Sequence, residues 1–102
     1  MAKELRIDGR MKVKTLKVQF KDAFGASLRV YKGKKFADDD ATLASIRSEG
    51  AKGGEFTVGG NLKVASFENK VKELYGIEVQ VANPDDTKLA DNGITLVAAG
   101  KA

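Results

Sequence analysis

The chain has 102 residues, of which 42% are hydrophobic and 31% charged, with a net charge of +4, and these values suit one folded domain. It has no histidine and no cysteine, which excludes disulfides, the usual zinc sites and catalysis by a histidine base or a cysteine nucleophile. No apolar run approaches the roughly 20 residues of a membrane helix, and no signal-peptide core is visible, so we expect a cytoplasmic protein without membrane contact.

The first half predicts a strand, a helix and a hairpin. Residues 4–8 alternate, with Leu5 and Ile7 on one face. A helix follows, because apolar residues recur at spacings of 3, 4 and 4 at Val13, Leu16, Phe20 and Phe24. It begins near Lys12 or is capped by Thr15, and Gly25 ends it. We expect a strand at 27–31, a turn at 32–34 and a short return strand at 35–37, while 41–47 fits either a strand or one helical turn.

The second half follows the same plan after a glycine-rich connector at 48–54. Phe56 and Val58 mark a strand, and a helix runs from about Val64 to Tyr75 before Gly76. A strand is expected at 77–81, turns at 83–86 and 91–93, and a buried last strand at 94–98.

The two halves are similar in sequence. Residues 4–31 match 55–82 at an offset of 51 with seven of 28 positions identical, and 36–43 match 89–96 with four of eight identical. Each copy, at roughly 45–50 residues, is too small for a stable core of its own, so we expect one shared core. The predicted fold is α+β: a tandem duplicated β-α-β-β module with two helices on one face of a mainly antiparallel sheet, related by a pseudo-twofold axis. Residues 1–102 then form a single domain of two repeats, 4–46 and 55–98.

The helix-to-hairpin region resembles a known family. Phe24-Gly25 closes the helix, LRVYKGKKFADD (28–39) is similar to the strand-turn-strand of ubiquitin-like β-grasp modules, and 41–43 stand where that family has a threonine-leucine turn. LADNGITLVAAG (89–100) is similar to the last strand of that family, although only one strand precedes the helix here. The whole chain is also similar to small uncharacterised bacterial proteins labelled viral A-type inclusion protein, a resemblance that implies no mechanism.

Two motifs of possible chemical interest have structural explanations. The triplet Asp38-Asp39-Asp40 has the carboxylates of a hard-metal site, but its counterpart 91–93 (Asp-Asn-Gly) is an ordinary turn. The glycines of 50–60 do not have the spacing of a phosphate-binding loop. We therefore expect no metal, cofactor or small-molecule substrate.

Positive charge is concentrated in the first half, where residues 1–51 hold 12 basic and 7 acidic side chains, while residues 52–102 hold 6 and 7. The second copy has mostly neutral or acidic residues at the corresponding places, so the fold does not require these charges. The candidate binding residues are Arg6, Lys14, Lys17, Lys21, Arg29, Tyr31, Lys34 and Lys35. Arg29 and Tyr31 are predicted on the same outer strand face, with Arg6 on the neighbouring strand.

These features favour a small non-enzymatic module that binds another protein or assembles with itself. Val18, which lies off the apolar helix face, is a candidate contact residue or an isolated exposed hydrophobe. The alternative function is binding of single-stranded nucleic acid, on which Tyr31 would stack among basic groups. The simplest alternative is that the basic side chains form a solvated surface.

Overall fold

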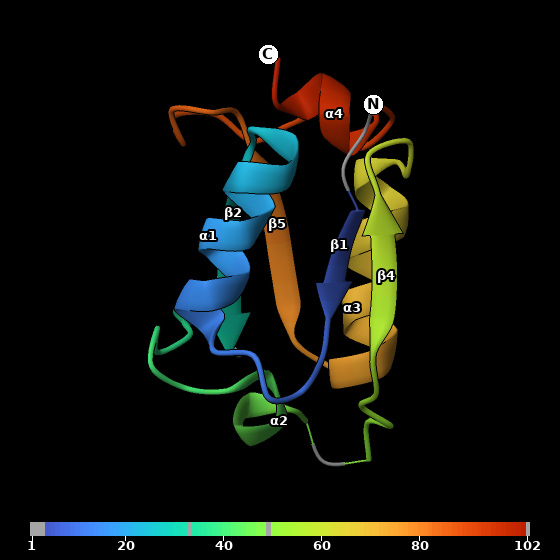
Figure 1. Ribbon diagram of the computed structural model, residues 1–102. Coiled ribbons are helices and arrows are strands. Elements are labelled where there is room, and N and C mark those ends of the chain that lie inside the picture. Colours follow the sequence, from blue (N-terminus) through green and yellow to red (C-terminus); the bar gives the residue numbers. More distant parts are fainter. Residues whose placement is uncertain (1–3, 33, 49, 102) are drawn as a thin grey trace.

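Residues 4–32, 34–48 and 50–101 are described by the computed structural model, and they form five strands and four helices (Figure 1). The strands are β1 (Glu4–Ile7), β2 (Ser27–Lys32), β3 (Lys35–Phe36), β4 (Phe56–Gly59) and β5 (Glu78–Ala82). The helices are α1 (Val13–Phe24), α2 (Leu43–Ile46), α3 (Val64–Tyr75) and α4 (Leu96–Ala99). The chain is an α+β protein, as its sequence predicts.

The strands form two antiparallel sheets, which corrects the prediction of a single sheet. β1 pairs with β4, and a second sheet has the order β3-β2-β5. At the middle of each long pairing the partners are 51 positions apart: Arg6 lies opposite Thr57, and Arg29 opposite Gln80. Alternation along the chain reveals which face of a strand is buried, but it does not reveal a partner so far away in sequence.

The two long helices begin without a side-chain cap. Lys12 and Lys63 occupy the N-cap positions, so of the two predicted alternatives the start near Lys12 is confirmed and the cap by Thr15 is wrong. The first amides of α1 instead donate to backbone carbonyls of the loop before α2, with Val13 N bonded to Ala41 O at 2.8 Å. These carbonyls satisfy donors that a capping side chain usually satisfies. Both helices end at a glycine with a left-handed backbone, φ 82° at Gly25 and φ 68° at Gly76, as predicted.

The two short helices lie in segments that the sequence does not predict as helices outright: 41–47 has two alternatives, and 94–98 is predicted to be a strand. Thr42 caps α2 by accepting a hydrogen bond from Ser45 N at 3.1 Å, and Thr95 caps α4 by accepting one from Ala98 N at 3.2 Å. The predicted last strand at 94–98 is therefore wrong, since this segment enters a helical turn that buries Leu96 and Ala99. A short apolar run fits a buried strand and a buried helical turn equally well.

One hydrophobic core receives side chains from both halves of the chain. Its centre contains the rings of Phe20 on α1 and Phe67 on α3, whose centroids lie 5.2 Å apart, and Phe24 packs edge-on against Phe20. The helices also make contacts between the halves, because α1 contacts α4 and α2 contacts α3. Among the described residues, no polar or charged side chain is buried in this core.

Several backbone hydrogen bonds occur at corresponding positions of the two halves. The bond from Val13 N to Ala41 O is matched by one from Val64 N to Ile94 O. Three further pairs match in the same way: Lys14 N to Asp39 O with Ala65 N to Asn92 O, Leu43 N to Met11 O with Leu96 N to Leu62 O, and Ala44 N to Gly9 O with Val97 N to Gly60 O. Similar stretches of sequence thus make similar local contacts.

The predicted turns are confirmed where they are described. Asp86 N donates to Asn83 O at 2.9 Å, and Gly93 N donates to the Asp91 carboxylate at 2.8 Å. Gly33, at the predicted turn 32–34, and Glu49, in the predicted connector 48–54, lie outside the described residues. Of the helices in the described segments, none has the length and apolar character needed to cross a membrane.

A shared core predicts that damage in one half destabilises both. Phe67→Ala should lower the free energy of unfolding by about 3–5 kcal/mol, because it leaves a cavity against Phe20. Denaturant unfolding followed by near- and far-UV circular dichroism should still show one transition. Val18→Ala is the matched control, since Val18 is 67% exposed, and it should change stability little. Two separate transitions would contradict a common core.

Candidate functional site

Three of the predicted binding residues are lysines of α1, and local partners engage all three. Lys14 forms an ion pair with Asp40 at 3.0 Å, and Lys17 forms one with Asp39 at 2.8 Å. Lys21 donates to the carbonyl of Pro84. The hydrogen bond and charge of Lys14 lower the pKa of Asp40. Asp39 and Asp40 therefore lie against α1 and neutralise Lys17 and Lys14.

Arg6 lies apart from the other predicted binding residues. It is on β1, in the two-stranded sheet, and forms an ion pair with Glu55. The expectation that Arg6 lies on the strand next to Arg29 is wrong, because β2 pairs with β3 and β5.

Arg29 is held by the turn that follows β5. Its Nε lies 2.7 Å from the Asp86 carboxylate, and its terminal nitrogen donates to the Asp86 carbonyl at 3.2 Å. The hydrogen bond to Asp86 is the main cause that raises the pKa of Arg29. Asp86 has φ 55°, so the contact fixes a residue in an uncommon backbone conformation. Arg29 therefore has a structural partner.

Tyr31 does share the outer face of β2 with Arg29, but the more exposed aromatic ring is on the next strand. Phe36 on β3 stacks on Tyr31 with ring centroids 4.8 Å apart and is 65% exposed. The Tyr31 hydroxyl donates to Gln80 Oε1 at 3.0 Å, and this hydrogen bond fixes the Tyr31 ring on which Phe36 stacks. Lys34 and Lys35 are exposed, and no ion pair joins either of them to another described residue. We call these four residues, Tyr31, Lys34, Lys35 and Phe36, the aromatic edge.

Phe36 is the functional candidate that the sequence reasoning missed, and a signal for it was present. In the predicted return strand 35–37, neighbouring side chains point to opposite faces. Ala37 is buried in the core, so Phe36 must point outward. The small side chain of Ala37 obscured this assignment, because a phenylalanine is ordinarily the residue expected inside.

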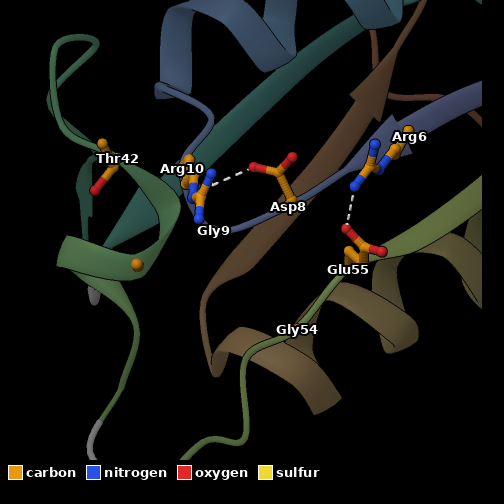
Figure 2. A pocket seen from close by; sticks show the side chains of 8 residues that line it. Arg6, Asp8, Gly9, Arg10, Thr42, Gly54 and Glu55 are labelled. Carbon is orange, nitrogen blue, oxygen red and sulfur yellow. Dashed lines mark hydrogen bonds and ion pairs between the residues drawn. The ribbon is translucent and has the colours of Figure 1, made fainter.

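A second candidate region is an open hollow of about 680 Å³ at the end of the two-stranded sheet (Figure 2). It is lined by two arginines and two carboxylates, together with Gly9, Thr42, Ala44 and Gly54. The Asp8 carboxylate accepts a hydrogen bond from Arg10 N at 2.9 Å, and Arg6 pairs with Glu55 (Figure 2). Its charges are balanced, and both carboxylates already have partners within the wall. This arrangement offers a polar surface, and it does not pair a nucleophile with a base.

A third region is a hollow of about 360 Å³ beside β5, whose lining includes Glu68, Glu78, Leu89 and Asn92. Glu68 on α3 is half-buried and accepts a hydrogen bond from Val81 N at 3.2 Å. Burial is the main cause that raises the pKa of Glu68, and the charge of Glu78 adds to it. We call Glu68, Glu78 and Leu89 the acidic edge.

Metal binding finds no support in these regions. No group of three or more acidic side chains within the described segments is arranged to hold a metal ion. The Asp38 carboxylate accepts a hydrogen bond from Asp40 N at 2.9 Å, as in an ordinary turn.

Comparison with known proteins adds no assignment. No protein-family model matches the chain, and comparison with curated proteins and with solved structures gives no significant match.

The raised pKa of Glu68 predicts a pH-dependent difference in stability. A carboxyl whose pKa is higher in the folded state stabilises the fold below its ordinary pKa of 4.5, and this contribution is lost as the pH rises through the folded value. Glu68→Gln removes the charge, so it should raise the melting temperature at pH 7 and leave it unchanged below about pH 4.

Glu73→Gln is the matched control, since Glu73 is an exposed residue of the same helix. Thermal unfolding of the three proteins between pH 3 and pH 8 makes the comparison. A lower melting temperature of Glu68→Gln than of the wild type at pH 7 would contradict the proposed cost of the buried charge.

Proposed function

We propose that this chain is a small non-enzymatic protein-binding module and that the aromatic edge is its binding surface. The observation that carries the proposal is Phe36, a large apolar side chain that is 65% exposed on an edge strand and held in place by Tyr31. An edge strand offers unpaired backbone groups to an extended segment of a partner, and an exposed aromatic ring offers apolar area. Lys34 and Lys35 beside it favour a partner segment with acidic residues.

The absence of histidine and cysteine supports the non-enzymatic part of the proposal. The carboxylates of the hollow in Figure 2 are bonded to arginine side-chain or backbone groups, which favours a structural role for them. We also place the protein in the cytoplasm, a proposal based on its composition alone.

We infer in addition that the two halves arose by tandem duplication and are related by a pseudo-twofold axis. The pairs Arg6–Thr57 and Arg29–Gln80, each 51 residues apart, support this, since such an axis passes between equivalent residues. The matched hydrogen bonds around α2 and α4 support it as well. In this scheme Phe36 corresponds to Leu89, so the two edges of the three-stranded sheet are equivalent positions that have diverged.

Single-stranded nucleic acid is the second candidate ligand, favoured by the stacked rings of Tyr31 and Phe36 next to two lysines that form no ion pair with another described residue. Against it, Arg6, Lys14, Lys17 and Arg29 are each engaged by an acidic side chain, which reduces the positive charge that they could offer to phosphate groups. Protein binding therefore accounts better for the exposed ring.

The test selects peptides that bind the chain from a displayed random library and measures their affinity by fluorescence anisotropy. Phe36→Ser should weaken binding about tenfold or more, on the scale of an apolar hot spot. Val18→Ser is the matched control, because it also removes an exposed apolar side chain, and it should leave affinity unchanged.

Failure to select any peptide, or equal binding by Phe36→Ser and wild type, would overturn the proposal. A single-stranded oligonucleotide is titrated in parallel at about 50 mM salt, where phosphate contacts are strong. Oligonucleotide binding that is lost with Phe36→Ser and Tyr31→Ala would establish the alternative.

A further inference from the structure

The three-stranded sheet ends in two edges that differ in charge. In the described residues no strand lies beyond β3 on one side, while beyond β5 the bridge from Ala82 to Leu89 occupies the outer backbone groups at Val81 and Asn83 and leaves the start of β5 uncovered. Lys34 and Lys35 make the β3 side basic, whereas on the β5 side Glu68 and Glu78 line an acidic hollow, with Lys88 next to Leu89. Each edge also has an exposed apolar side chain, Phe36 at 65% and Leu89 at 45%.

The charges of the two edges favour contact between different edges of two copies over contact between identical edges. Two β3 edges brought together would place lysines against lysines, and two β5 edges would place glutamates against glutamates. A β3 edge against a β5 edge places lysine against glutamate and phenylalanine beside leucine. Of these three arrangements, the β3 edge against the β5 edge is the one that brings lysine to glutamate.

We propose that the aromatic edge of one copy docks against the acidic edge of a second copy, so that their sheets join side by side. The inference rests on the proposed function, because it uses the same surface and names its partner. Lys35 would approach Glu78 and the hollow that Glu68 lines, while Phe36 would cover the exposed part of Leu89.

The surroundings of Glu68 favour the binding of a cationic side chain from a second copy. Its carboxyl is half-buried and accepts a hydrogen bond from Val81 N, and burial together with the like charge of Glu78 raises its pKa. An ammonium group entering this hollow would compensate the lost solvation and bring the pKa of Glu68 down. A basic side chain is therefore the chemistry that the hollow lacks.

The contact is heterologous, since it joins two different surfaces, and each added copy presents a further free edge. Exposed ion pairs contribute only about 0–1 kcal/mol each, and β3 has two residues, so the association should be weak and salt-sensitive. We expect a dissociation constant on the order of 100 µM at low salt, typical of a small transient interface.

A charge-exchange experiment tests the proposal. Sedimentation velocity is recorded for the wild type, Lys35→Glu, Glu78→Lys and an equimolar mixture of the two variants, at low and high salt. The wild type should associate with rising concentration, each variant alone should associate at least about fivefold more weakly, and the mixture should recover association. Lys101→Glu is the control for net charge, because the exposed Lys101 follows α4 in the chain and belongs to neither edge, and it should behave as wild type.

A wild type that stays monomeric at about ten times the expected dissociation constant, or a mixture that sediments as its separate components, would overturn the inference. Circular dichroism of each variant establishes that it is folded. If the wild type is monomeric while selected peptides still bind through Phe36, the partner is wrong and the proposed function stands. If neither a second copy nor any peptide binds, both fail.

Discussion

The packing of Phe20 against Phe67 is the contact on which the rest of the fold depends. Each half of the chain is too small to bury a core alone, and this pair joins the long helix of one half to that of the other. The two rings are not at equivalent positions: Phe20 corresponds to Val71, and Phe67 to Leu16. At these two pairs of corresponding positions, each half thus supplies one phenylalanine and one smaller apolar side chain. Such a combination of large and small side chains suits close packing between the halves. The strands also join the two halves, because β1 pairs with β4 and β2 pairs with β5, each a strand of the opposite half.

Local features of the sequence predict the helices well and the sheets poorly. The spacing of Val13, Leu16, Phe20 and Phe24 defines a helix face, and Gly25 marks its end, because these signals arise within a few residues. The division into two sheets depends on partners about fifty residues away, and the last apolar segment becomes a helical turn through Thr95. Among the candidate site residues, the sequence finds Tyr31, Lys34 and Lys35 but misses Phe36. It also misses that Asp39, Asp40 and Asp86 neutralise Lys17, Lys14 and Arg29, since those ion pairs are made by the fold. The resemblance of the helix-to-hairpin region to ubiquitin-like modules stays a prediction.

The surface properties of the two halves differ more than their cores do. Buried positions exchange one apolar residue for another, whereas positions outside the core differ in charge: Lys17 corresponds to Glu68, and Arg29 to Gln80. The core constrains volume and polarity, and it leaves the sheet edges free to change. A module of this kind can acquire two different binding edges without a change in its core. The aromatic edge and the acidic edge are the result that we propose for this chain.

The most direct test of this account is a dilution series of the ¹⁵N-labelled chain followed by two-dimensional NMR. We predict that the amide signals that move with concentration belong to residues 34–36 on one edge and to 68, 78–81 and 89 on the other. The shifts should shrink when salt is added, because the contact depends on exposed charges. Spectra that do not change with concentration, or shifts confined to the hollow around Arg6 and Arg10, would contradict it.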